Sequence, residues 1–143
     1  MHHGGIRAAT PKSRRLRLSV PHLAAALGIF AIEVLIARFV HDTLVRPFIG
    51  DVLVIVLLHC ALRSLLALPA GWTALGVLLF ACAIELGQAA NLVGLLGLEH
   101  SQLARIVIGT AYDPRDFVAY ALGSLLALLG ERVARRSGAQ LGS

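Results

Sequence analysis

The sequence predicts an all-α integral membrane protein: a four-helix bundle with a short interfacial or re-entrant helix between the third and fourth spans. Only 15% of the 143 residues are charged and 57% are hydrophobic, whereas soluble domains carry about 25% charged residues. The apolar residues gather in four runs, three of them long enough to cross a hydrocarbon core of ~30 Å. A chain of this length has no large core in which to bury so much apolar sequence.

The first half of the chain predicts two spans joined by a polar turn. Residues 1–20 form a basic tail, and the first span covers residues 21–40, which we interpret as an uncleaved signal anchor. Pro47 and Gly50 are expected to break the helix in a turn over residues 41–51. Asp51 is then expected to begin the second span, which reaches about residue 68, because a carboxylate favours a helix start.

The second half predicts two more spans separated by an irregular segment. The third span covers residues 72–93, with Trp72 as an interfacial anchor. Residues 94–115 are too polar to span, but Leu103, Ile106 and Val107 have helical spacing, which indicates an amphipathic helix in the interface or re-entering the bundle. The fourth span runs from Asp116 to about residue 130, and either residues 113–115 or residues 131–133 can extend it. The transmembrane domain is thus residues 21–133, and residues 134–143 form a second basic tail.

Basic residues at both ends set the expected topology. Arginines and one lysine precede the first span, and three arginines follow the last: Arg7, Lys12, Arg14, Arg15, Arg17, Arg132, Arg135 and Arg136. The positive-inside rule then predicts that both termini are cytoplasmic. Nucleic-acid binding is not expected, because the aromatic-interleaved basic surface that it needs is missing.

Acidic and polar residues inside the apolar spans are the main functional signal. A carboxylate in hydrocarbon costs roughly 2.5–3.5 kcal/mol, so we expect these side chains to face a polar cavity toward the outer half of the bundle. Glu85, Gln88 and Asn91 recur every three residues and should lie along one side of the third span. The predicted ligand-binding residues are Glu33, Arg38, Arg46, Asp51, Glu85, Gln88, Arg105, Asp113, Asp116 and Tyr120.

The same residues also have a purely structural interpretation. Polar side chains between membrane helices often serve as interhelical hydrogen bonds worth about 0.6 kcal/mol each. Two pairs of small residues, Ala83 with Gly87 and Gly123 with Ala127, indicate close helix contacts. A lone His59 in the second span fits a hydrogen-bonding group better than a metal ligand. No metal or cofactor is expected, because no ligand spacing supports one.

Four motifs carry a resemblance to a known family. They are RPFIGD over residues 46–51, the Glu85-x-x-Gln88 pair, LARIVIGT over residues 103–110, and Asp113-x-x-Asp116-x-x-x-Tyr120-x-x-Gly123. Over about residues 25–130 the chain resembles the YjgA-like family of small bacterial membrane proteins of unknown function. A more distant similarity is to VanZ-like proteins, whose Glu-x-x-Gln, Arg, Asp and Gly pattern is matched by Glu85, Gln88, Arg105, Asp116 and Gly123. Tyr120 departs from that pattern, since VanZ-like proteins tend to have Asn there.

The resemblance implies a location and a class of ligand. A bacterial protein of this kind is expected in the cytoplasmic (inner) membrane, in contact with membrane lipid. The association of VanZ-like proteins with the cell envelope implies, by analogy, an outward-facing pocket for a lipid-linked or envelope-related polar ligand. Two alternatives stay open: an intramembrane enzyme with Glu85 or Asp116 as general base, and a small homo-oligomeric transporter in which Glu33 and Glu85 relay protons.

Overall fold

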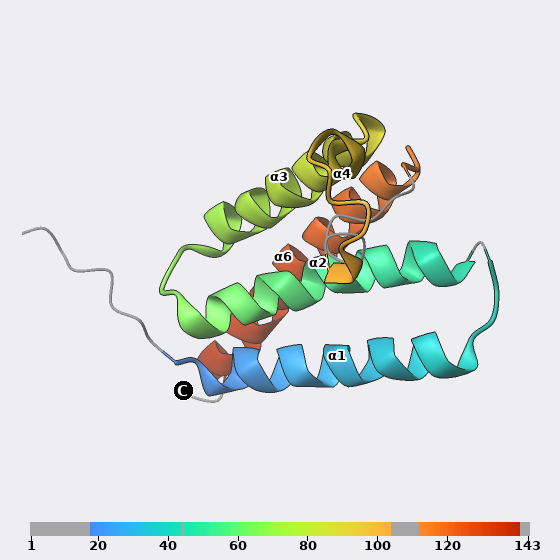
Figure 1. The fold of residues 1–143 in the computed structure, drawn as a ribbon. Helices are drawn as coiled ribbons and strands as arrows, with labels where there is room; N and C mark the ends of the chain where they lie inside the picture. The colour runs from blue at the N-terminus through green and yellow to red at the C-terminus, as the bar shows by residue number, and fades with distance from the viewer. Residues whose placement is uncertain (1–17, 44, 104–111, 141–143) are drawn as a thin grey trace, which may run out of the picture.

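The computed structural model describes residues 18–43, 45–103 and 112–140, with side chains to residue 138. This part of the chain folds into helices without strands, in the order α1 (Val20–Phe39), α2 (Val45–Leu65), α3 (Ala70–Ala89), α4 (Leu92–Leu95) and α6 (Asp116–Gln140), as shown in Figure 1. Within the described ranges, α1, α2, α3 and α6 are each long and apolar enough to span a membrane. The predicted all-α fold with four apolar spans is therefore confirmed.

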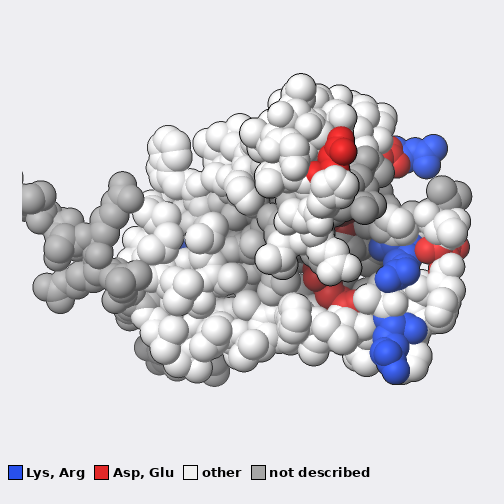
Figure 2. Space-filling view, viewed as in Figure 1, with Lys and Arg blue, Asp and Glu red and all other residues white. Residues whose placement is uncertain are grey.

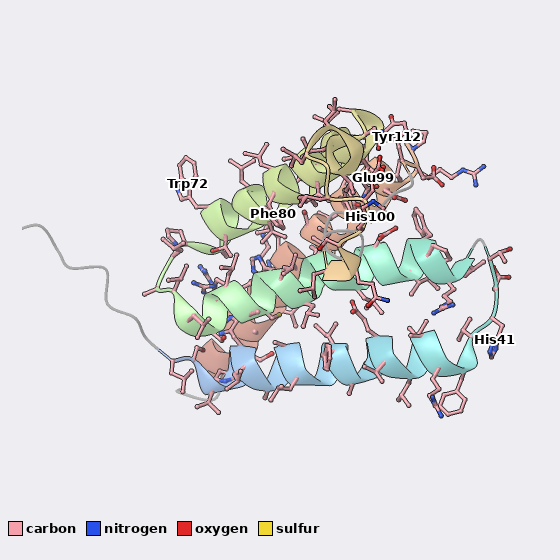
Figure 3. All side chains as sticks on the ribbon, in the orientation of Figure 1. His41, Trp72, Phe80, Glu99, His100 and Tyr112 are labelled. Carbon is pink, nitrogen blue, oxygen red and sulfur yellow. The ribbon has the colours of Figure 1, made fainter. Side chains whose placement is uncertain are left out.

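The four long helices alternate in direction, and α2 lies at the centre of the arrangement (Figure 1). Helix α2 packs against α1, α3 and α6, and α3 also packs against α6. One end of the bundle holds the start of α1 and the end of α6; we call it the Trp72 end, and the opposite end the His41 end, after the two residues labelled there in Figure 3. At the Trp72 end, the Ser19 backbone N–H donates to the Ser64 carbonyl oxygen at 2.8 Å, which ties the start of α1 to the end of α2.

The buried core is small and lies between α2, α3 and α6. Ile55, Val77, Ala81 and Tyr120 form its central cluster. Helix α1 buries only Ala26 among its side chains, and large apolar residues stay exposed over all four long helices. Helices that are apolar on all sides are typical of membrane spans, in which lipid covers the outward faces.

Helix α2 begins six residues earlier than the sequence predicts. Its first residue is Val45, whose backbone N–H donates to Asp42 Oδ1 at 2.7 Å, so Asp42 caps this end. Pro47 is the third residue of the helix, where its missing N–H costs no intrahelical hydrogen bond. The predicted turn is therefore wrong over residues 45–51, and Gly50 and Asp51 lie within the helix.

The ends of α3 and α6 also differ from the prediction. Helix α3 stops at Ala89, because Asn91 adopts a left-handed conformation with φ of 50° before the short α4. Asn91 therefore does not continue the helical face of Glu85 and Gln88, as the sequence had indicated. Helix α6 continues ten residues past the expected end at residue 130, so Glu131 is a helical residue. Of the predicted amphipathic segment, Ile106 and Val107 lie outside the described residues.

One predicted close contact is confirmed and the other is wrong. A Cβ added to Gly123 would lie 2.6 Å from the Val52 carbonyl oxygen and 2.8 Å from Ile55 Cβ, so α6 approaches α2 closely at this position. Ala127, one turn further along α6, is buried. Ala83, in contrast, is exposed on α3, and a Cβ added to Gly87 would lie 3.3 Å from Leu92 Cδ2 of the short α4, so within the described fold this pair marks no contact between two long helices.

Candidate functional site

A cavity of about 670 Å³ opens between α1 and α2 at the His41 end. In the space-filling view, acidic side chains lie in the hollowed right-hand part of the molecule, with basic side chains beside them (Figure 2). The polar residues of the lining come from the second half of α1, the turn that follows it and the first two turns of α2: Glu33, His41, Asp42, Thr43, Arg46 and Asp51. We call this space the His41-end cavity.

Glu33 is the polar group that α1 contributes. Its side chain is half-buried, and its Oε1 atom is buried without a hydrogen-bond partner in the described part of the chain. A buried polar atom that loses its water without gaining a partner costs about 1–3 kcal/mol, and more when it carries charge. A hydrogen-bond donor in the cavity, from a ligand or from water, would remove this cost.

Arg46 and Asp51 reach the cavity because α2 starts at Val45. Arg46 and Gly50 are four residues apart, as are Pro47 and Asp51, so they share one face of the first two helical turns. An arginine guanidinium is suited to bind phosphate or carboxylate, often through two parallel hydrogen bonds. The cavity thus combines one fixed cation with carboxylates from both helices.

Behind the cavity, Asp51 joins a cluster of carboxyl groups from three helices. The Asp51 carboxyl group on α2 interacts with the Asp116 carboxyl group at the start of α6. Glu85 on α3 is completely buried; its Oε1 accepts from the Asp113 backbone N–H at 2.8 Å and its Oε2 from the Tyr120 hydroxyl at 3.3 Å. Glu85 therefore holds residue 113 and the first turns of α6 against α3.

The structure brings most of the predicted site residues together in these two adjoining groups. Glu33, Arg46 and Asp51 line the His41-end cavity, and the cluster behind it contains Asp51, Glu85, Asp113, Asp116 and Tyr120. Arg38 is exposed on α1 and is not part of the cavity lining, and Gln88 is half-buried on α3. Arg105 lies outside the described residues.

A second polar group, at the Trp72 end, is not anticipated by the sequence. Glu131 on α6 accepts through Oε1 from Arg63 Nε at 2.7 Å and lies 3.0 Å from His22 Nε2 and 3.4 Å from His59 Nε2. Arg63 also donates to the Leu68 carbonyl oxygen. One sequence feature could have indicated this group: His59 and Arg63 are one helical turn apart, so both can contact the same carboxylate.

The described residues contain no group of three or more His, Cys, Asp or Glu side chains suited to hold a metal ion. The side chains of the two polar groups can recognise a ligand by charge and by hydrogen bonding. The His41-end cavity offers carboxylates for an amine or hydroxyl group and one guanidinium for an anion. The Glu131 group offers imidazole and guanidinium nitrogen atoms around a single carboxylate.

Comparison with known proteins gives a family but no activity. The model of a family described as "Protein of unknown function (DUF2809)" matches residues 40–124. This range holds α2, α3, α4 and the first part of α6, and with them the carboxyl cluster, but it excludes Glu33 and Glu131. No curated protein and no solved structure matches the chain. Because the match covers more than half of the 143 residues, the chain belongs to the DUF2809 family of proteins of unknown function.

Proposed function

We propose that this membrane protein binds the polar headgroup of a lipid-linked or envelope-related ligand in the His41-end cavity. The observation that carries the proposal is the buried Oε1 of Glu33, which has no hydrogen-bond partner among the described residues and belongs to the cavity lining. An ammonium or hydroxyl group of a ligand would satisfy this atom. Arg46, on the opposite wall, would bind a phosphate of the same headgroup.

The charge of the cavity indicates which headgroups fit. Among the described lining residues, Glu33, Asp42 and Asp51 provide three carboxyl groups and Arg46 one guanidinium, a formal charge of −2 with every carboxyl group ionised and His41 neutral. A purely anionic ligand would meet net repulsion in this space. A ligand that carries an amine as well as a phosphate would match both kinds of group.

The size and place of the cavity agree with a headgroup ligand. Sites for small molecules commonly occupy about 300–1,000 Å³, and the His41-end cavity has about 670 Å³. The exposed apolar surface of α1 beside it would leave a lipid tail in contact with the bilayer. Under the positive-inside rule the His41 end would face outward from a bacterial inner membrane, with both termini cytoplasmic. The resemblance to VanZ-like proteins supports an envelope-related ligand by analogy only.

The hydrogen bonds that Glu85 accepts favour a binding protein over an enzyme. Both of its carboxylate oxygens already accept hydrogen bonds from the protein, from Asp113 and Tyr120. Glu85 is also completely buried, whereas a general base must come within hydrogen-bond reach of the substrate proton that it takes. Glu85 fits a positioning role, in which it fixes the start of α6 and with it Asp116, the partner of Asp51.

The experiment that tests this proposal fills the cavity. Gly50 lines it, and a Cβ at this position would meet no atom within 4 Å, so Gly50→Leu adds a side chain to the lining with no clash at its Cβ. Gly76→Leu on α3 is the matched control, because Gly76 is equally open and lies outside the lining. Leucine also has a higher helix propensity than glycine, so both variants should fold.

Binding would be measured by native mass spectrometry of the detergent-extracted full chain, titrated with phosphatidylethanolamine, which carries amine and phosphate, and with phosphatidylglycerol as the amine-free comparison. We expect Gly50→Leu to lose phosphatidylethanolamine binding and Gly76→Leu to retain it. Glu33→Gln should weaken binding by about 10- to 100-fold, the value of a hydrogen bond to a charged group. Equal binding by Gly50→Leu and Gly76→Leu would overturn the proposal.

A further inference from the structure

A second cavity, of about 500 Å³, lies at the Trp72 end between α1, α2 and α6. It is separate from the His41-end cavity, with which it shares no lining residue. Its polar part contains the Glu131 group described above together with Arg135, and its remaining wall is apolar. We call it the Trp72-end cavity.

The polar part of this cavity has the opposite charge to the His41 end. Arg63 and Glu131 neutralise each other through a 2.7 Å hydrogen bond and a second contact of 3.4 Å. Arg135 then leaves a formal charge of +1, with both histidines neutral. Its Nε lies 4.0 Å from Glu131 Oε2, beyond hydrogen-bond distance, and its side chain is 67% exposed, so its guanidinium donors remain available to an anion.

His59 supplies an additional polar side chain to the lining of the cavity. It is 1% exposed and lines the cavity, and its Nδ1 has no hydrogen-bond partner in the described chain. With a proton on Nε2, which faces Glu131 at 3.4 Å, Nδ1 is an acceptor. A hydroxyl group on a ligand would satisfy it.

The apolar wall has the form that an acyl chain needs. Ala25 and Ile29 lie one turn apart along α1, and Val56 and Leu126 face the same space from α2 and α6. This wall leads from the polar group at the end of the bundle toward its middle. A phosphate-binding end joined to an apolar groove between spanning helices suits the phosphate and the adjoining part of one acyl chain of a phospholipid.

We infer that the Trp72-end cavity binds an anionic phospholipid with a hydroxyl-bearing headgroup. Arg135 holds the phosphate, His59 Nδ1 accepts from the headgroup hydroxyl, and the acyl chain lies along Ala25 and Ile29. The lipid comes from the leaflet at this end of the bundle, where Trp72 is exposed as an interfacial anchor would be. This site is independent of the proposed headgroup ligand at the His41 end.

Two pairs of variants test the site. Gly130 lines the cavity and has no atom within 4 Å of an added Cβ, so Gly130→Leu fills the space; Gly138→Leu, on the same helix and equally open but outside the lining, is its control. Arg135→Gln removes the phosphate-binding charge, and Arg132→Gln removes an exposed arginine of α6 that does not line the cavity. Glycine-to-leucine changes favour the helix, so loss of folding is not expected from them.

The full chain would be titrated in neutral detergent with phosphatidylglycerol, phosphatidylcholine and inorganic phosphate, and bound lipid counted by native mass spectrometry. We expect phosphatidylglycerol to bind the wild type and both controls, Gly130→Leu to bind it at least about tenfold more weakly, and Arg135→Gln about fivefold more weakly. Gly50→Leu should bind it normally, which separates this site from the His41-end cavity. Equal affinity of Gly130→Leu and Gly138→Leu, or displacement of the lipid by millimolar phosphate, would overturn the inference.

Discussion

Substitution of Gly123 by alanine tests the close approach of α6 to α2. The added Cβ would lie 2.6 Å from the Val52 carbonyl oxygen and 2.8 Å from Ile55 Cβ, distances that real Cβ atoms essentially never show. Relief to 3.0 Å requires α6 and α2 to separate by about 0.4 Å (3.0 − 2.6), and one of the two blocking atoms is backbone. Overpacking of this kind typically costs about 1–3 kcal/mol.

The matched control for this change is Gly28→Ala on α1, where the added Cβ meets no atom within 4 Å. Both variants gain up to about 1 kcal/mol of helix propensity, so the difference between them isolates the clash. Unfolding of the purified protein in mixed micelles, followed by circular dichroism against denaturant, should place Gly123→Ala about 1–3 kcal/mol below Gly28→Ala. Equal stability of the two variants would refute the close approach of α2 and α6.

Two further predictions concern the polar groups at the two ends. Glu131→Gln should lower the free energy of unfolding by about 3 kcal/mol, because it leaves the partly buried His22 and Arg63 without their acid. Its control, Glu99→Gln on an exposed segment, should stay within about 0.5 kcal/mol of wild type. The same unfolding assay compares the two variants, and similar effects would contradict a structural ion pair. Tyr120→Phe removes the 3.3 Å hydrogen bond to Glu85 and should cost about 1–2 kcal/mol. Tyr112→Phe at an exposed position is its control, and an unchanged midpoint for both would show that the bond does not contribute.

The sequence predicts the spans well because their signal is local. Each long apolar run becomes one helix, and length and composition are enough to recognise it. The start of α2 is mispredicted because Pro47 and Gly50 are read as breakers, although a proline in the first turn loses no hydrogen bond and Asp42 caps the helix. The end of α3 depends on a single left-handed residue, Asn91, which periodicity cannot identify.

The sites could be predicted only in part, because they depend on how the helices pack. Charge inside an apolar run is visible in the sequence, so Glu33 and Glu85 stand out. Glu131 does not, since it lies just past the apolar run and looks like an ordinary boundary residue. Its partner Arg63 is 68 residues away and His22 is 109 residues away, and no local pattern links positions so far apart.

The polar contacts that hold α1 at one end affect how far its other end can move. Its polar contacts to other helices, within the described chain, are at the Trp72 end: the bond from Ser19 to Ser64 and the contact from His22 to Glu131. When a rigid helix rotates about one end, the opposite end is displaced most. Helix α1 has 20 residues and is therefore about 30 Å long, so a tilt of about 4° about the Trp72 end moves its far end by about 2 Å. The width of the space beside Glu33 therefore changes with small rotations of α1.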